Sequence, residues 1–271
     1  MVLEIKKHVL DLMVKNVERL HERYVLLKLT CAEKLPAMLP GQFVEVRIDG
    51  MPSTFLRRPI SINFYDKTAN ELWLLVATVG DGTRHLAELK AGDTLNCMLP
   101  LGNGFTTLPS SRKVLLVGGG VGVAPLLYLG AELRESGVEP TFLLGARTKN
   151  DLLMLSEFSK YGRVLVTTED GSEGERGFVT NHSVLSQEHF DLIQCCGPTP
   201  MMKAVARYAH QSNTPCEVSL ENLMACGLGA CLCCVEKVKK NSDDKSENSV
   251  ATNVCVCKEG PVFDINRLLW D

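Results

Sequence analysis

Four cysteines near the end of the chain constrain its fold more than any other feature of the sequence. A C-x4-C-x2-C spacing runs from Cys226 through Cys231 to Cys234, and Cys257 follows further along. Two glycines fall inside the first interval, where they allow unusual torsions and the close approach of backbone N–H groups to sulfur. The pattern predicts a segment that folds around a group held by thiolates, because it is too short to own a conventional core.

The spacing is that of plant-type [2Fe-2S] sites, in which a distant cysteine completes C-x4-C-x2-C. The predicted cluster ligands are Cys226, Cys231, Cys234 and Cys257. A structural zinc site is the alternative, although zinc usually takes two short cysteine pairs. Cys233 and Cys255 break the spacing and are read as spectators, and Cys255 remains a rival for the position of fourth ligand.

The use of cysteine also indicates a compartment. Seven of the 11 cysteines lie from Cys216 onward, and the N-terminus lacks the long apolar core of a signal peptide. We therefore expect a cytoplasmic protein with reduced thiols and no disulfide framework. A formal net charge of -3 gives no general attraction to phosphate backbones, which disfavours nucleic-acid binding.

The first hundred residues read as short strands between turns, with no long helical period. Within one of them Val44, Val46 and Ile48 alternate with Glu45 and Arg47, which is typical of a strand with one buried face. Such a pattern predicts an antiparallel β-barrel. The expected strands include 24–30, 42–48 and 71–79.

After Pro109 the rhythm changes to apolar runs separated by helical segments, which predicts an α/β domain with a mainly parallel sheet. The stretch 114–131 is uncharged, but its glycines and Pro125 indicate a strand, a turn and a helix, not a membrane span. The expected strands are 113–117, 141–144, 163–167, 192–195 and 217–220, and the expected helices are 125–135, 149–160 and 200–210.

These regions predict a multidomain chain of all-β and α/β parts. The expected domains are a barrel over 1–108, a dinucleotide-binding α/β domain over 109–215 and a small cysteine-rich domain over 216–271. Within the last, the segment 239–248 is almost entirely polar and is expected to be a solvated loop.

Two motifs in the barrel region could bind a flavin. Arg57 and Arg58 precede Pro59-Ile60-Ser61, a combination that can hold a diphosphate and the edge of a planar ring. Gly82-Thr83 can open a helix whose N–H groups face phosphate. The alternative is an ordinary pair of surface arginines followed by a turn.

A glycine cluster in the second region could bind a dinucleotide. Gly118, Gly119, Gly120 and Gly122 lie between an apolar strand and a helix, where amide groups can receive a pyrophosphate. Val123 departs from the strict fingerprint, so a tight structural turn is a fair rival. The segment Cys196-Gly197-Pro198 follows a later strand, and the two loops could flank one cleft.

Taken together, the motifs resemble those of the electron-transfer subunits of dihydroorotate dehydrogenase type B, in the ferredoxin reductase superfamily. The resemblance spans nearly the whole chain and is most specific in the C-terminal part. It is carried, in order, by 58–61, 82–83, 102–105, 118–126, Thr168-Glu-Asp-Gly171, 196–198, 217–221, Met224-Ala-Cys226-Gly-Leu-Gly-Ala-Cys231 and Cys257-Lys-Glu-Gly-Pro-Val-Phe263.

The resemblance implies site residues. The residues expected at FAD are Arg58, Pro59, Ile60, Ser61, Leu75, Val76, Ala77, Gly82 and Thr83. Gly118 to Gly122 and the loop at Cys196 would meet NAD, and Cys226, Cys231, Cys234 and Cys257 would bind the cluster. The stretch between Cys234 and Cys257 is longer than in the family, which makes the fourth ligand the least secure.

The resemblance also implies a function. An FMN-containing catalytic subunit would oxidise dihydroorotate for pyrimidine (UMP) biosynthesis, and this chain would pass the electrons through [2Fe-2S] and FAD to NAD+. A flavin must transfer electrons between the cluster and NAD+, since hydride chemistry moves two electrons and the cluster passes one. Two copies of each subunit are expected.

Three questions stay open at the level of sequence. The chain could be the small subunit of a sulfide dehydrogenase or of a ferredoxin-NADP oxidoreductase, or a zinc-stapled interaction or regulatory module. Arg147, after the second α/β strand, could pair with the 2′-phosphate of NADP or lie in solvent, and NAD is expected only because of the family. No catalytic residue is assigned to this chain.

Overall fold

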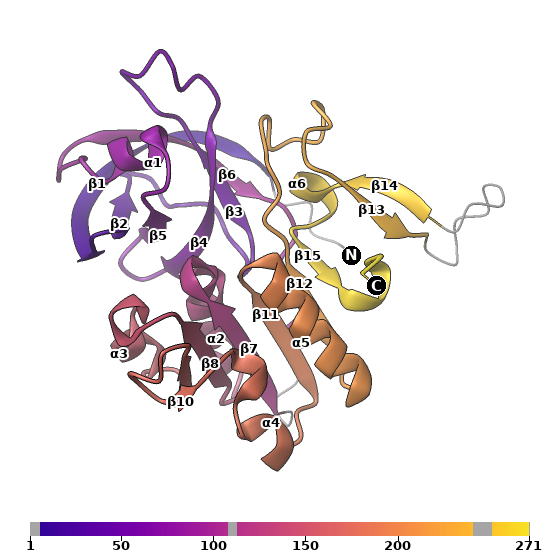
Figure 1. Cartoon of the computed structure of the whole chain (residues 1–271). Coiled ribbons are helices and arrows are strands. Elements are labelled where there is room, and N and C mark those ends of the chain that lie inside the picture. Colours follow the sequence, from indigo (N-terminus) through magenta and orange to yellow (C-terminus); the bar gives the residue numbers. More distant parts are fainter. Residues whose placement is uncertain (1–5, 108–112, 241–250, 271) are drawn as a thin grey trace.

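The computed structural model describes residues 6–107, 113–240 and 251–270. The chain forms a β-barrel, an α/β layer beneath it and a cysteine-bearing arm at the side (Figure 1). Most of the predicted polar loop, 241–248, lies outside the described residues.

The barrel is closed, as predicted, in the order β1-β2-β5-β4-β3-β6, and every neighbouring pair is antiparallel. Leucines from facing strands fill it, and Leu27, Leu29, Leu72 and Leu74 are fully buried. Its elements are β1 His8–His21, β2 Tyr24–Thr30, β3 Phe43–Val46, β4 Arg58–Asp66, β5 Glu71–Ala77, α1 Asp81–Leu86 and β6 Thr94–Leu101.

The α/β layer contains one sheet in the order β10-β9-β8-β7-β11-β12-β15, parallel except for the last pair. Helices α2 Ala124–Glu135 and α5 Thr199–Gln211 match two predicted helices. The other main elements are β7 Val114–Gly119, β8 Thr141–Ala146, β9 Arg163–Thr168, β10 Glu175–Arg176, α4 Val184–Gln187, β11 Leu192–Cys196, β12 Cys216–Ser219 and β15 Val262–Asp264.

The helix expected over 149–160 is not continuous. A 3-10 turn, η2 Lys149–Asp151, and a short helix, α3 Leu155–Phe158, stand in its place. Met154 between them has a φ of 55°, a left-handed conformation that interrupts a right-handed helix. The segment 114–131 forms β7, the 3-10 turn η1 Gly120–Val123 and the start of α2, and no helix in the described ranges is long and apolar enough to cross a membrane.

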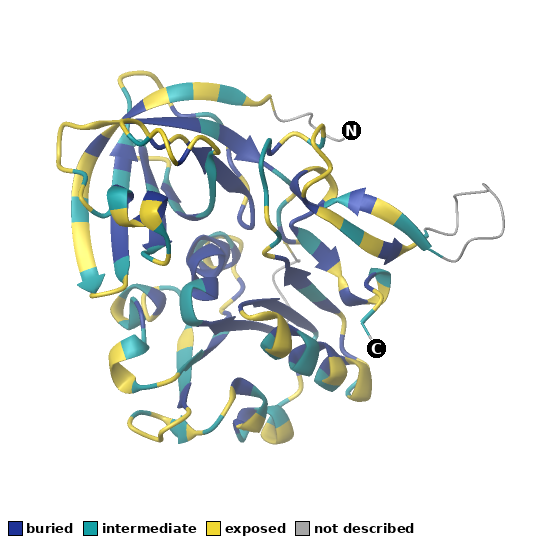
Figure 2. Cartoon of the chain, turned by 45° about the horizontal axis from the view of Figure 1, so that its top comes forward, coloured by how far each residue is buried: buried dark blue, intermediate teal, exposed yellow. Residues whose placement is uncertain are grey.

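The barrel and the α/β layer meet along α2, whose side chains reach into the barrel. Tyr128 donates a hydrogen bond to the Met38 carbonyl at 3.0 Å, and its ring meets those of Phe64 and Tyr65 edge-on. Asn63 of β4 donates to the Ala124 carbonyl at 2.9 Å. Figure 2 shows buried residues both in the barrel strands and in the helices, and most of α2 is buried, from Ala124 to Gly130 and at Leu133.

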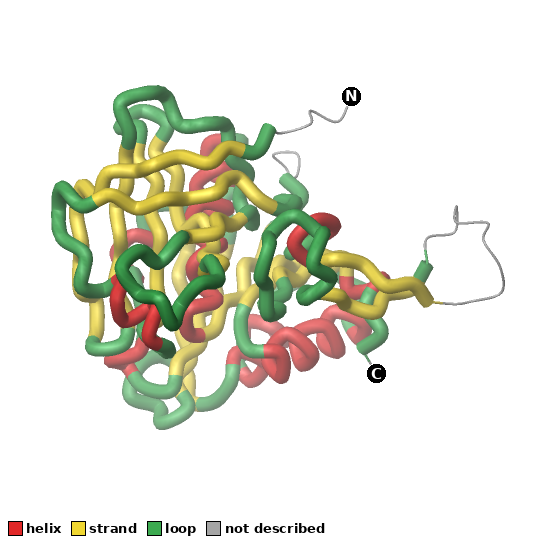
Figure 3. Tube along the Cα trace, turned by 90° about the horizontal axis from the view of Figure 1, so that it is seen from above, coloured by secondary structure: helices red, strands yellow, loops and turns green. Residues whose placement is uncertain are grey.

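The C-terminal arm holds a two-stranded ribbon that projects away from the body of the molecule (Figure 3). Its elements are β13 Val235–Lys239, β14 Ala251–Cys255, α6 Val256–Glu259 and the 3-10 turn η4 Ile265–Arg267. The base of the arm shares the core of the α/β layer, because Val238, Val254 and Phe263 pack with the side chains under β11 and β12. The sheet therefore runs across the expected boundary at residue 216.

Candidate functional site

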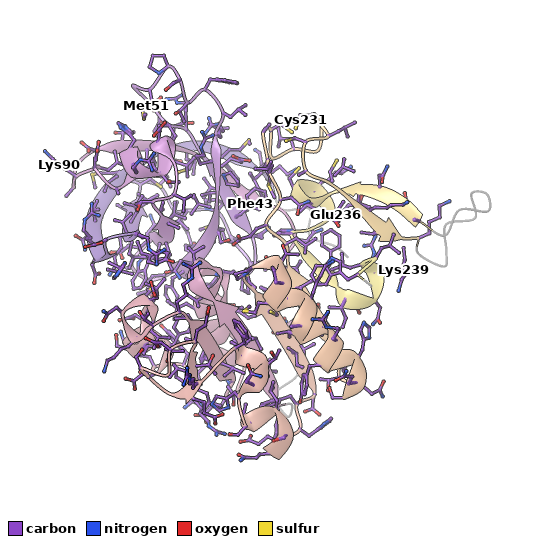
Figure 4. The ribbon with its side chains drawn as sticks, in the orientation of Figure 1. Phe43, Met51, Lys90, Cys231, Glu236 and Lys239 are labelled. Carbon is purple, nitrogen blue, oxygen red and sulfur yellow. The ribbon has the colours of Figure 1, made fainter. Side chains whose placement is uncertain are left out.

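The cysteine-bearing loop wraps its backbone around sulfur atoms. The N–H of Leu228 donates to Cys226 Sγ at 3.3 Å, and the N–H of Gly229 donates to Cys257 Sγ at 3.1 Å. Such N–H···S bonds stabilise thiolate and are the outer support that iron–sulfur sites use. Figure 4 places Cys231 near the tip of this loop, beside the barrel.

The four predicted cluster ligands form two pairs. Cys226 interacts with Cys231, and Cys234 interacts with Cys257. A two-iron centre needs this arrangement, since each iron takes two thiolates. Among the described residues, no three His, Cys, Asp or Glu side chains gather in the way that would hold a metal ion directly.

The loop also prepares one thiol for ionisation. Burial raises the pKa of Cys226, but the N–H groups of Leu228, Cys231 and Ala230 outweigh it and lower that pKa to about 6. Burial, and then the neighbouring thiol of Cys234, raises the pKa of Cys257 to about 12. Because iron ligands must be deprotonated, Cys257 reaches its ligand form only together with the metal charge.

Cys255 and Cys257, the two candidates for the fourth ligand, have thiols in different surroundings. Cys257 is buried, its Sγ accepts the N–H of Gly229, and its own N–H donates to Cys234 Sγ at 3.4 Å. The Cys255 thiol instead faces a carbonyl oxygen, that of Gly229, at 3.7 Å. A ligand thiolate gains from amide donors and loses beside carbonyl oxygens, so the geometry favours Cys257.

Gly227 of the loop lies directly against the barrel. Gly227 has a φ of 65°, and a Cβ built on it would lie 2.8 Å from Cγ of Glu45 on β3. No side chain fits between them. Glycine is needed here both for its backbone conformation and for the close approach.

The sequence predicted Glu45 as the outward residue of an alternating strand, and this was wrong. All four residues of β3 are buried, because the cysteine-bearing loop covers the face that would otherwise meet solvent. Both carboxyl oxygens of Glu45 lack a hydrogen-bond partner among the described residues, and burial raises its pKa to about 7. The burial of Glu45 becomes visible only in the structure, where the cysteine-bearing loop contacts β3.

The expected flavin residues come together at one end of the barrel. Arg58 to Ser61 open β4, Leu75 to Ala77 close β5, and Gly82 and Thr83 lie in the first turn of α1. A Cβ on Gly82 would lie 3.2 Å from Nε of Arg58, so the guanidinium group sits directly against this turn. A diphosphate placed there would meet a cation and backbone N–H groups together.

The two arginines differ in what they have left to bind. Arg57 donates to the Asn96 side chain at 2.5 Å and to the carbonyls of Glu45 and Asn96. Among the residues that the structure describes, Arg58 donates to the carbonyls of Leu56 and Arg57, through one of its nitrogens. Arg57 is thus a structural clamp of the barrel, and Arg58 keeps donors for a ligand.

The two loops expected at the dinucleotide lie side by side at the carboxyl edge of the sheet. Gly118 and Gly119 end β7, and Gly120 and Gly122 lie in η1. The two loops touch each other, because a Cβ on Gly122 would lie 2.4 Å from Cα of Gly197, and a cleft between them stays a prediction. The Cys196 thiol is buried and burial raises its pKa, so a ligand would meet the backbone of this loop and Pro198, not sulfur.

Comparisons with known proteins show which family and which domains this chain is similar to. A sequence model described as the iron-sulfur cluster binding domain of dihydroorotate dehydrogenase B matches residues 221–269, and an oxidoreductase NAD-binding domain matches 116–207. The dihydroorotate dehydrogenase B (NAD(+)) electron transfer subunit of Listeria innocua is 42% identical over 228 residues, which are 83% of this chain and 85% of that protein. That of Fusobacterium nucleatum is 40% identical over 230 residues, 83% of this chain and 84% of its own length.

Solved structures are similar as well. The NADH-dependent reduced ferredoxin-NADP oxidoreductase superposes with a TM-score of 0.82 at 31% identity, covering 96% of this chain and 90% of that one. The ferredoxin reductase of carbazole 1,9a-dioxygenase superposes with a TM-score of 0.66 at 21% identity, over 78% of this chain and 68% of that one. The second likeness shows the fold alone.

Proposed function

The chain belongs to the family of dihydroorotate dehydrogenase B electron transfer subunits, and from this premise we propose that it carries electrons from dihydroorotate to NAD+. An FMN-containing partner subunit oxidises dihydroorotate to orotate, a step of pyrimidine biosynthesis. The [2Fe-2S] cluster supplies single-electron transfer, and FAD supplies the exchange of an electron pair with NAD. The chain itself holds these groups in order and lacks the orotate chemistry.

One observation carries this proposal. The barrel strand β3 contacts the cysteine-bearing loop and also pairs with β4, the strand that begins with the expected flavin residues. Gly227 packs against Glu45 on β3, and Glu45 pairs in register with Pro59 of β4. The proposed cluster site and the proposed flavin site are therefore separated by a single β-strand. The packed strand also excludes water from the space between them.

We assign the binding roles accordingly. Cys226, Cys231, Cys234 and Cys257 hold the cluster, with backbone N–H groups supporting Cys226 and Cys257. Arg58 holds the FAD diphosphate beside Gly82, and the half-buried residues Pro59 to Ser61 and Ala77, with the buried Leu75 and Val76 beneath them, line the flavin. The glycine loop after β7 and the backbone of 196–198 receive NAD. The functional units are 1–108 for FAD, 109–215 for NAD and 216–271 for the cluster.

The surface around the cysteine-bearing loop suits a protein partner. Leu223 and Leu232 are 85% and 64% exposed, and Cys231, next to Leu232 in the sequence, is exposed as well. Exposed leucines clustered at a redox site indicate a docking face, because a partner must approach the cluster closely and exclude water. We propose a cytoplasmic assembly of two copies of each subunit, docked through this face.

The test uses the chain purified anaerobically, alone and with its co-purified partner. The chain alone should contain FAD, iron and acid-labile sulfide, and should reduce a dye with NADH but leave dihydroorotate untouched. Addition of the partner should restore dihydroorotate-dependent NAD+ reduction. Oxidation of dihydroorotate by the chain alone would refute the division of labour, as would folded protein without iron.

A second function is favoured by the likeness to the NADH-dependent reduced ferredoxin-NADP oxidoreductase, which covers more of this chain than the curated relatives do. In that function the same cluster and flavin would serve a different large subunit. The partner captured from native cells decides between them: a subunit with FMN and dihydroorotate activity supports the first, and one that reduces NADP+ supports the second.

A further inference from the structure

Arg57 holds a positive charge against the outer wall of the barrel. In the described part of the chain, its guanidinium group donates to the carbonyl oxygens of Glu45 and Asn96 and to the side-chain amide oxygen of Asn96. These acceptors are all neutral. By contrast, Arg47, which directly follows β3, is paired with the carboxylate of Asp49 at 2.6 Å. The hydrogen bonds of Arg57 therefore fix its position but leave its charge uncompensated.

A short network of hydrogen bonds holds this guanidinium group in place. Asp11 of β1 pairs in register with Asn96 of β6, and the Asp11 carboxylate accepts from the side-chain amide of Asn96 at 2.6 Å. That bond orients the amide, so that its oxygen faces Arg57 at 2.5 Å. Asn96 is buried, so little water competes for these bonds. The charge of Arg57 is thus anchored to two neighbouring barrel strands.

The cysteine-bearing loop covers the strand that Arg57 contacts. Arg57 Nη1 lies 3.1 Å from the carbonyl oxygen of Glu45, and a Cβ built on Gly227 would lie 2.8 Å from Cγ of the same glutamate. Burial is the main cause of the raised pKa of Glu45, while the charge of Arg57 lowers that pKa and the thiol of Cys226 raises it. Arg57 and the first predicted cluster ligand are therefore both within electrostatic reach of one buried side chain.

A fixed charge at this place acts on the redox equilibrium of a cluster. A cluster that accepts an electron gains one negative charge, so a nearby cation stabilises the reduced form more than the oxidised form. Net charge is one of the factors that set the reduction potential of iron–sulfur centres. The contact between β3 and the loop is fully buried at Glu45, so water and salt screen the interaction weakly there.

We propose that Arg57 raises the reduction potential of the cluster and so makes it a better acceptor of electrons from the partner subunit. The proposal rests on the proposed function, since it concerns the same cluster. The carboxyl groups of Asp11 and Glu45 act in the opposite direction, Asp11 from the exposed end of the network. Arg58 is assigned to the FAD diphosphate, which compensates its charge. Arg57 is therefore the cation left to act on the cluster from the barrel side.

The first experiment removes the charge of Arg57. In the full chain loaded with FAD and cluster, a reductive titration followed by electron paramagnetic resonance of the reduced cluster measures its midpoint potential. Arg57→Met should lower the ratio of reduced to oxidised cluster at a fixed ambient potential by about ten-fold, a shift of about 59 mV to more negative values. Arg57→Lys keeps the charge and should keep most of the parent potential. Iron content is measured on the same samples.

Two further variants separate an effect of charge from a loss of structure. Asp11→Asn keeps an acceptor for the Asn96 amide but removes a negative charge, so the midpoint should move to more positive values. The rise should be smaller than the fall in Arg57→Met, because Asp11 is exposed and more strongly screened. Arg47→Met is the matched control and should leave the midpoint unchanged, since the charge of Arg47 is already paired with Asp49.

The outcomes separate this proposal from the proposed function. A midpoint that Arg57→Met leaves unchanged, or that Arg57→Lys lowers equally far, overturns the proposal, because Arg57 then acts only as a clamp of the barrel. A midpoint that Asp11→Asn lowers or leaves unchanged also overturns it, and this variant decides if Arg57→Met does not retain its cluster. A parent chain with neither iron nor a resonance signal after reduction contradicts the proposed function itself.

Discussion

The barrel and the cysteine-bearing arm are stabilised in different ways. The barrel has its own core of fully buried leucines and valines, enclosed by a ring of paired strands. The described part of the arm has no separate core. The side chains at its base pack into the core under β11 and β12, while its tip carries thiols and exposed leucines. The difference indicates that apolar burial specifies the flavin scaffold, whereas the metal centre completes the arm.

The largest expected effect is loss of the metal centre from the arm while the barrel stays folded. Cys257→Ser removes a buried ligand from the second cysteine pair, so the protein should lose its iron, its acid-labile sulfide and the cluster's share of the visible absorption, while the flavin bands remain. Hydrogen exchange should accelerate in 221–234 and stay slow in β2 and β5 of the barrel.

The matched control is Cys255→Ser, two residues away, whose thiol faces a carbonyl. It should retain full iron content. Retention of the cluster by Cys257→Ser together with its loss from Cys255→Ser would reverse the assignment of the fourth ligand.

A core substitution tests the opposite half of the comparison. Leu74→Ala on β5 deletes a fully buried side chain, and should lower the free energy of unfolding by about 2–5 kcal/mol. Urea titration followed by flavin fluorescence measures it. Iron per folded chain should not change, and a parallel loss of iron would mean that the arm depends on the barrel core.

Glu45 lies where the two regions touch, so its titration reports on their contact. Its pKa is about 7 in the fold against an ordinary value near 4.5, so the folded state holds a proton that the unfolded state releases. A raised acid pKa gives stability that is complete below pH 4.5 and is lost as the pH rises to 7. Glu45→Gln should therefore gain about 2 kcal/mol relative to the parent chain between pH 5.5 and 8, by urea unfolding. A difference that is flat with pH would mean that the carboxyl is solvated.

The smallest effect concerns the polar rim between the barrel and α2. Lys67 Nζ lies 2.7 Å from Glu132 Oε1, but half of the lysine side chain is exposed. Lys67→Ala should cost less than about 1 kcal/mol and less still in high salt. Lys67→Arg should be neutral, and a larger loss would show that this pair, and not Tyr128, holds the junction.

Local periodicity predicted most of the fold. Alternating residues located the barrel strands, and the glycine cluster located the turn between β7 and α2. It failed at β3, because the cover over Glu45 comes from a loop far away in the sequence. It also failed at Met154, where a left-handed residue splits the expected helix without glycine or proline to signal it.

The candidate site was predictable where spacing alone defines it. The cysteine spacing indicated a cluster, and the structure adds the two contacting pairs. The choice between Cys255 and Cys257 depends on which sulfur faces an N–H group, and no sequence pattern encodes that.

The ribbon β13–β14 begins directly after Cys234, and its register pairs Val235 with Cys255. The last two proposed ligands, Cys234 and Cys257, are therefore brought together at the base of the ribbon by the pairing of β13 with β14. The length of the chain between these two strands does not enter this pairing. The far end of the ribbon is accordingly the place to graft an affinity tag or a spin label without disturbing electron flow.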